Sequence, residues 1–254
     1  MATARGAAPL AAFVLHRWDW SESSLILDLF TRAQGRATVA AKGAKKPHSN
    51  LRAVLLPFQR VNVTLGRVPE GDGASDIQTL RQAEWAGGAA MLTGEALFSG
   101  FYLNELLMKL MARHDPHPAL FDAYAQTLPA LAASDETRVQ AALRAFELTL
   151  LREIGLLPDL AVATLTLQPL RAEALYALRP EAGVIEATGD EAGVPGAVLI
   201  ALQTALDRAV LESLQQTCAL ALPALKTQLR ALLHYHLGST PLRTRAVMHD
   251  LRTL

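Results

Sequence analysis

The sequence has 254 residues, of which 51% are hydrophobic and 19% charged, so it can bury a sizeable core and is not a disordered or fibrous chain. Lys plus Arg equals Asp plus Glu, which excludes a protein that is basic or acidic throughout. The single cysteine, Cys218, excludes an internal disulfide framework and predicts a reducing cytoplasm as the location. We expect neither a signal peptide nor a membrane span, since no run approaches the roughly 18 apolar residues that a span needs.

The first 85 residues predict a small barrel. Five β-prone runs, at 13–18, 24–31, 37–43, 60–66 and 77–84, are separated by polar or glycine-rich turns. In the run at 60–66, Val61, Val63 and Leu65 alternate with polar residues, which is typical of a strand with one buried face. The oligonucleotide-binding (OB) fold is the best-known small barrel of this kind, although strand count alone does not single it out.

After residue 85 the pattern becomes helical. Apolar runs at 94–113 and 117–134 predict two helices, and 134–158 predicts a third, with Ser134 as its N-cap. The stretch at about 159–195 has short β-like segments, and two more helices are predicted at 196–215 and 223–237. The expected fold class is therefore α+β. A barrel domain at 1–85 precedes a mainly helical domain at 86–254, which carries a small β-containing insertion.

Charge is distributed unevenly along the chain. Eight basic residues and no acid lie between Thr31 and Pro69, whereas residues 153–217 carry a net charge of −6. Because a solvated surface normally mixes both signs, so one-sided a run predicts a surface that faces a polyanion such as nucleic acid. The candidate contacts are Arg32, Arg36, Lys42, Lys45, Lys46, Arg52, Arg60 and Arg67, with Arg243 and Arg245 in the basic tail.

Aromatic side chains near this run could stack on bases, as they do in proteins that bind single strands. Trp18, Trp20 and Phe58 are the nearby candidates. We favour the alternative interpretation, in which all three are core aromatics of the barrel.

The sequence carries no recognisable catalytic or metal-binding motif. It lacks a nucleophile elbow, a phosphate-binding glycine loop and a Cys-x-x-Cys pair, and the basic run holds no carboxylate for a divalent metal. We interpret the paired histidines, His114 with His117 and His234 with His236, as chance surface residues. We expect a binding protein without metal or cofactor. The main alternative is an RNA-binding or ribosome-associated OB protein, and the second is an enzyme with an unrecognised site.

Four segments in the same order resemble the bacterial recombination mediator family RecO. They are "FVLHRWDWSESSLILDLFTRAQGRATVAAKGAKK", "LFSGFYLNELLMKL", "LRAFELTLLREIGLLP" and "LGSTPLRTRAVMHDLR". Together they bracket nearly the whole chain. The resemblance implies an N-terminal OB barrel and a C-terminal helical domain.

The resemblance also implies a function in DNA repair. Members of the family bind single- and double-stranded DNA and anneal complementary strands coated with single-stranded DNA-binding protein (SSB). With RecR they help to load RecA onto SSB-coated DNA. The resemblance thus implies a cytoplasmic, nucleoid-associated mediator whose partners are DNA, the SSB C-terminal tail and RecR, with a functional link to RecA.

One segment departs from the family pattern. Many members carry a four-cysteine zinc module after the third predicted helix, but residues 159–195 contain no cysteine. The chain therefore resembles the branch that lacks the metal.

The resemblance further implies a site for the acidic SSB tail, which ends in phenylalanine. Arg144 matches a family arginine implicated in gripping that tail. Its expected apolar surroundings on the helices are Leu148, Leu151, Phe101 and Tyr102.

Overall fold

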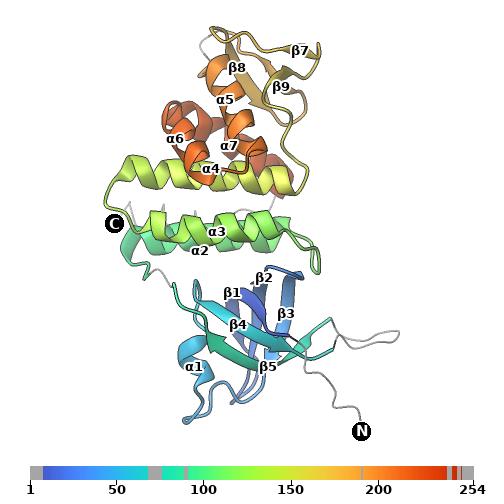
Figure 1. Cartoon of the computed structure of the whole chain (residues 1–254), viewed down its shortest axis with the longest axis vertical. Coiled ribbons are helices and arrows are strands. Elements are labelled where there is room, and N and C mark those ends of the chain that lie inside the picture. Colours follow the sequence, from blue (N-terminus) through green and yellow to red (C-terminus); the bar gives the residue numbers. More distant parts are fainter. Residues whose placement is uncertain are drawn as a thin grey trace. The chain divides into compact units, whose positions relative to one another are not determined.

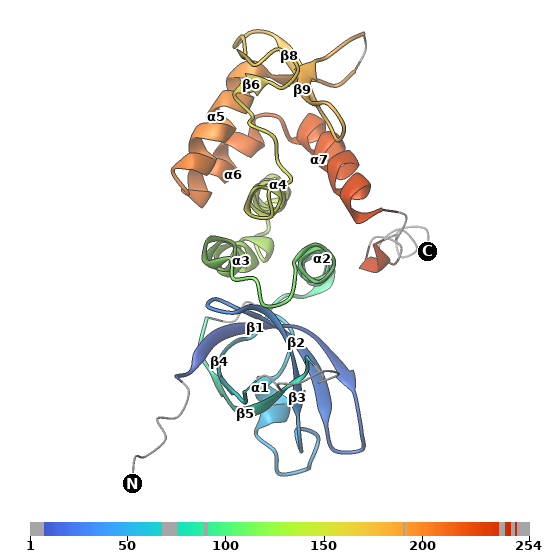
Figure 2. The ribbon, with the colours of Figure 1, turned by 90° about the vertical axis from the view of Figure 1, so that its right-hand side faces the viewer.

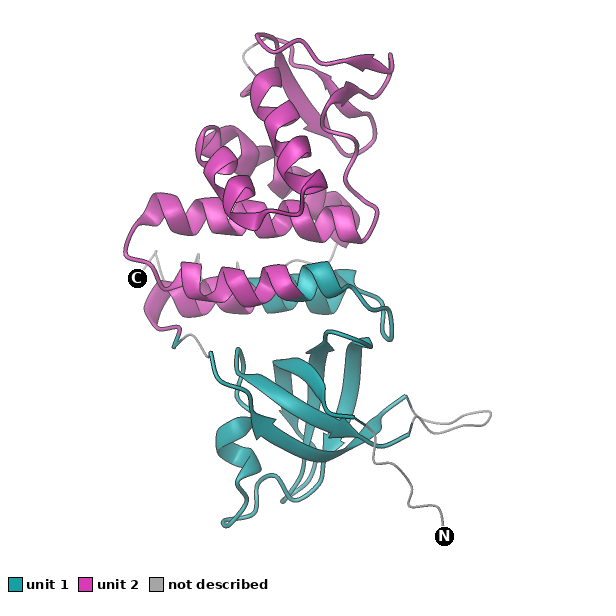
Figure 3. Ribbon diagram, in the orientation of Figure 1, with its two compact units in different colours: residues 1–91, 103–121 teal, residues 92–102, 122–254 magenta. Residues whose placement is uncertain are grey.

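The computed structural model describes residues 8–67, 76–88, 91–189, 191–238, 242–244 and 247. The chain divides into two compact units (Figure 3). The barrel unit holds residues 1–91 and 103–121, and the helical unit holds residues 92–102 and 122–254. The division differs from a single boundary after residue 85, because the end of helix α2 (Gly94–Leu110) and the start of helix α3 (Pro118–Leu131) belong with the barrel.

Five strands close into a barrel in the order β1-β2-β3-β5-β4, with β4 pairing back onto β1 (Figures 1 and 2). Strands β3 and β5 are parallel, and the other pairs are antiparallel. This is the topology of an OB fold, so the predicted fold class is confirmed. The strands are β1 (Leu10–Asp19), β2 (Leu25–Thr31), β3 (Gly35–Ala41), β4 (Arg60–Leu65) and β5 (Gln78–Trp85), with the short helix α1 (Leu51–Val54) between β3 and β4.

The barrel interior follows the alternation of the sequence. Val61, Val63 and Leu65 are buried, and they pack with the inward-facing residues of the other strands. The register of β1 against β2 shifts between Val14 and His16. Beyond this bulge β1 leaves the core, and Arg17, Trp18 and Asp19 are all exposed.

Residues 103–121 cover one side of the barrel within the same unit. The Asn104 amide donates to the Leu15 carbonyl at 2.8 Å, and the Phe121 ring packs on Phe13 and Phe30 with centroids 5.1 and 5.4 Å away. Gly35 is required at the β2–β3 turn because its φ is +68° and a Cβ there would lie 2.0 Å from the Asp115 carbonyl oxygen.

The helical unit is built around α4 (Glu136–Glu153). Its N-cap is Asp135, which accepts from the Thr137 amide at 2.9 Å, so the prediction of Ser134 is wrong by one residue. The single helix predicted at 196–215 is also wrong, because the chain breaks at Ala209, whose φ is +52°. The helices that follow α4 are α5 (Gly196–Asp207), α6 (Leu211–Ala219) and α7 (Leu222–Leu237).

The predicted β-containing insertion is confirmed as two small sheets. Gln228 of α7 accepts from the Leu178 amide at 3.1 Å and donates to the Ala192 carbonyl at 2.9 Å, which fixes the helix to the larger sheet. The strands are β6 (Val162–Ala163), β7 (Gln168–Pro169), β8 (Leu175–Arg179), β9 (Gly183–Glu186) and β10 (Val194–Pro195).

Candidate nucleic-acid interface

A loop rich in lysine lies at one end of the barrel, between β3 and α1. We call residues 42–50 the lysine loop. The Lys45 amide donates to the Ser23 carbonyl at 2.9 Å, and the Gly43 amide donates to the Ser24 hydroxyl at 3.4 Å. These bonds hold the lysine loop against the β1–β2 turn, so cations and aromatics from both segments share one end of the barrel.

The charges at this end are predominantly positive. Lys42 and Lys46 are exposed, and no carboxylate of the described residues forms an ion pair with either. Lys45 is partly covered and pairs with Asp19, its ammonium nitrogen 3.2 Å from a carboxylate oxygen. Arg52 on α1 is also exposed. A polyanion can therefore approach Lys42 and Lys46 without displacing an internal partner.

The predicted basic run is split by the fold. Arg32 lies in the β2–β3 turn, where its amide donates to the Ala11 carbonyl at 3.0 Å. This turn is at the opposite end of the seven-residue strand β3 from the lysine loop, roughly 20 Å away at the usual rise per residue. The structure therefore separates Arg32 from the lysines, and Arg60 is exposed at the start of β4, away from both.

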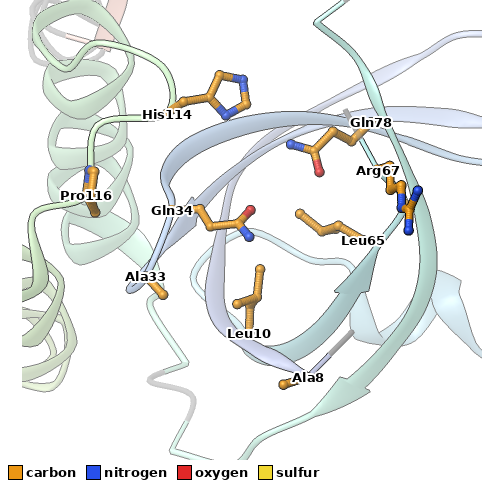
Figure 4. A pocket seen from close by; sticks show the side chains of 10 residues that line it. Ala8, Leu10, Ala33, Gln34, Leu65, Arg67, Gln78, His114 and Pro116 are labelled. Atoms are coloured by element: carbon orange, nitrogen blue, oxygen red, sulfur yellow. The ribbon is translucent and has the colours of Figure 1, made fainter. Parts of the chain in front are cut away.

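A cavity of about 540 Å³ opens at the Arg32 end of the barrel. Figure 4 shows the amide groups of Gln34 and Gln78 directed into it over Leu10 and Leu65, with Arg67 at its edge. The lining mixes apolar and polar groups, and Arg67 is the predicted cation that reaches it.

Arg36 has a partner inside the barrel unit. Its guanidinium donates to the Met108 carbonyl of α2, and its Nε is buried without a hydrogen-bond partner. Burial also lowers the pKa of this guanidinium. Its role is to join β3 to α2, so we leave Arg36 out of the proposed surface.

The tryptophans of β1 are exposed, which overturns the prediction that they are core aromatics. Trp18 is 43% exposed and Trp20 is 57% exposed, whereas Phe58 is 4% exposed and does pack in the barrel. The bulge after Val14 explains the difference, because it carries β1 beyond the core. Arg17, which the sequence analysis missed, is exposed beside them.

Arg144 of α4 is buried in the helical unit and paired. Its guanidinium lies 2.8 Å from the Glu147 carboxylate, and the two side chains are 8% and 0% exposed. The Tyr102 hydroxyl donates to the same Glu147 oxygen at 2.7 Å. The anionic partner that Arg144 needs is thus internal. Its position three residues along the helix was a signal that the sequence analysis missed.

The apolar residues predicted around Arg144 are mostly core. Leu148 and Leu151 are fully buried, and Phe101 and Tyr102 are half-buried. In this conformation Leu148 and Leu151 offer no open wall to a peptide.

The tail cations are only partly described. Arg243 is exposed and belongs to the helical unit, and Arg245 lies outside the described residues. The structure therefore does not bring the tail together with the lysine loop.

Metal-binding groups are absent from the described part of the chain, where no three His, Cys, Asp or Glu side chains cluster. Residues 159–195 do not fit the four-cysteine zinc module of related proteins, since they contain no cysteine.

Comparison with known proteins decides the family. The family model "Recombination protein O N terminal" matches residues 9–89, and "Recombination protein O C terminal" matches residues 91–246. The chain belongs to the RecO family. The DNA repair protein RecO of Polaromonas sp. (strain JS666 / ATCC BAA-500) is 54% identical over 245 residues, 96% of each chain. That of Verminephrobacter eiseniae (strain EF01-2) is 52% identical over the full length of both chains.

Family membership gives the protein a role in DNA repair, and it favours DNA over the RNA-binding alternative. Separately, the helices in the described ranges include none with the length and apolar character to cross a membrane.

Proposed function

We propose that this RecO family member is a recombination mediator that binds single- and double-stranded DNA and catalyses no bond change. The observation that carries the proposal is the lysine loop, where Lys42 and Lys46 are exposed at one end of an OB barrel. Membership of a DNA repair family supports DNA as the polyanion.

The chemistry of this surface suits binding without sequence preference. Lysine ammonium groups neutralise phosphates and release counterions, which provides affinity for any sequence and makes it depend on salt. Screening the charge of two strands also lowers their mutual repulsion. On this basis the protein anneals complementary SSB-coated strands and, with RecR, helps to load RecA onto SSB-coated DNA.

We also propose that the helical unit contacts the SSB tail, with Arg144 as the predicted anchor. Because Glu147 already neutralises Arg144, a tail carboxylate would have to displace Glu147 from it. The Tyr102 hydroxyl would lose its acceptor in the same step. Tail capture at this point therefore requires a local rearrangement of α4 and its neighbours.

The decisive experiment replaces Lys42 and Lys46 together with glutamine and measures DNA affinity at several salt concentrations. Each phosphate of a single strand that a lysine no longer neutralises lowers the slope of log affinity against log salt by about 0.7, so we expect a drop of about 1.4 and weaker binding. The matched control is Lys226→Gln with Arg230→Gln, two exposed cations of α7 in the helical unit. Unchanged affinity and slope in the lysine-loop variant would remove this loop from the site.

An RNA strand of the same sequence tests the alternative function. A mediator of DNA repair should bind the DNA strand at least as tightly, and an SSB tail peptide should bind to the wild-type protein. Preference for RNA together with no peptide binding would favour the RNA-binding alternative.

A further inference from the structure

Two tryptophans project from the same end of the barrel as the lysine loop. Trp18 and Trp20 are 43% and 57% exposed, although tryptophan is among the side chains that gain most from burial. A single exposed aromatic is ordinary, but two within three residues, beside exposed lysines, form a combined surface.

Backbone bonds and ring packing fix both tryptophans in place. The Trp20 amide donates to the Ser24 carbonyl at 3.2 Å, which closes the β1–β2 turn that the lysine loop contacts. The Trp18 ring packs on His16 with centroids 4.5 Å apart and an interplanar angle of 69°. The Asp19–Lys45 ion pair then links the segment between the tryptophans to the lysine loop. The aromatics and the cations are therefore held together as one surface.

We propose that Trp18 and Trp20 stack on unpaired bases of a DNA strand whose phosphates contact the lysine loop. The inference rests on the proposed function and adds to it a preference for single strands. Indole faces stack on any base, so the contact is independent of sequence. In a duplex the bases are already stacked on one another, and exposing them costs a few kcal/mol per step.

The preference has a consequence for annealing. Before pairing, each strand is held by both its phosphates and its bases. Once the complementary bases pair, they leave the tryptophans, and only the phosphate contacts of the lysine loop remain. The duplex product is then held less tightly than either single strand, which favours release after annealing.

The test is fluorescence anisotropy of Trp20→Ala and Trp18→Ala/Trp20→Ala on three labelled DNAs: an oligodeoxythymidine strand, an abasic strand of equal length and a duplex. We expect the double variant to lose roughly five- to a hundredfold in affinity for the base-containing strand, the usual range for removing a stacking aromatic. Affinity for the abasic strand and the duplex should not change. The salt slope should also stay constant, since the lysines that neutralise phosphates are all retained.

Two further variants guard against a merely structural effect. Trp18→Phe/Trp20→Phe keeps an aromatic face at each position and should restore most of the affinity for the base-containing strand. Trp85→Ala is the matched control. Trp85 is 62% exposed and pairs with Val61, which pairs with Ala12 of β1, six residues before Trp18 and roughly 20 Å from it along the strand.

The outcomes separate the inference from the proposed function. Equal losses on all three DNAs, or no loss on the base-containing strand, would overturn stacking while leaving the lysine loop as a DNA site. Binding of none of the three DNAs by the wild-type protein would instead overturn the proposed function itself.

Discussion

The barrel unit and the helical unit treat positive charge in opposite ways. Lys42 and Lys46 extend from a loop into solvent, whereas Arg144 lies in the middle of α4 with only 8% of its side chain exposed. The buried cation has the Glu147 carboxylate as its partner, and that carboxylate is also bonded to Tyr102. Burial therefore decides whether a cation of this chain is available to a ligand or committed to its own fold.

The contrast matters because both sets of residues were predicted to bind anions. A lysine in a loop loses little hydration when DNA approaches, and it exchanges counterions for phosphates. Arg144 must first lose Glu147, which would leave a fully buried carboxylate without its cation. The two predicted sites thus have very different costs of use, and variants can measure them.

The largest effect should come from Arg144→Ala. Removing one partner of a buried ion pair leaves the other charge uncompensated, so we expect the free energy of unfolding of the helical unit to fall by about 3–5 kcal/mol. Chemical denaturation followed by circular dichroism measures the change. The control is Arg138→Ala, an exposed arginine of the same helix, which should change stability little.

A double variant tests the cause. Arg144→Met with Glu147→Gln removes both charges while keeping an acceptor for the Tyr102 hydroxyl, so it should recover much of the lost stability. If the double variant is less stable than Arg144→Ala alone, the buried ion pair is not the reason for the loss.

Sequence patterns predicted the barrel well because one face of each strand is buried. The alternation of Val61, Val63 and Leu65 with polar residues specifies which face is inside. No comparable local signal marks the bulge between Val14 and His16, and without it Trp18 and Trp20 read as core residues. The break at Ala209 was missed for a similar reason, since its positive φ occurs at a residue that ordinarily favours a helix.

The candidate site was less predictable than the fold. A count of cations along the chain cannot tell that Arg32 and the lysine loop lie at opposite ends of β3, or that Arg36 donates to the Met108 carbonyl. Those facts depend on strand pairing and on contacts between distant segments. The pairing of Arg144 with Glu147, by contrast, was within reach of the helical spacing alone.

A pH-dependent effect is expected close to the same ion pair. Burial raises the pKa of the Cys218 thiol, which Arg144 lowers and Glu147 raises to smaller extents. Because the folded pKa exceeds the unfolded one, the thiol contributes fully below the unfolded pKa, about 8.5, and its contribution is lost as pH rises above it. One pH unit higher, the loss is about 1 kcal/mol.

Denaturation of Cys218→Ala and the wild type across alkaline pH isolates this contribution. Other groups that titrate in this range affect both proteins equally, so the wild type should lose more stability than the variant. Parallel curves would contradict the role of the buried thiol. In the folded wild-type protein the thiol should also resist modification, since the thiolate is the reactive form.

Glu147→Gln tests whether the SSB tail uses Arg144. The tail carboxylate must compete with Glu147, so removing the competing charge should tighten binding of an acidic peptide ending in phenylalanine by up to about tenfold. Fluorescence anisotropy of the labelled peptide measures the change, with Glu136→Gln at the exposed start of α4 as the control. If affinity is the same in both variants, the tail binds elsewhere and Arg144 is purely structural.

The smallest effect should come from Asp19→Asn, which removes the one ion-pair partner that the structure describes for Lys45. An exposed pair of this kind is worth little, so we expect single-stranded DNA to bind more tightly by at most about fivefold. The freed Lys45 adds a phosphate contact, so the salt slope should steepen by about 0.7. Glu22→Gln is the matched control, because it removes an equally exposed negative charge from the same turn without breaking that pair. A slope that steepens equally in both variants would mean that the change in overall charge, rather than the release of Lys45, controls binding at this end of the barrel.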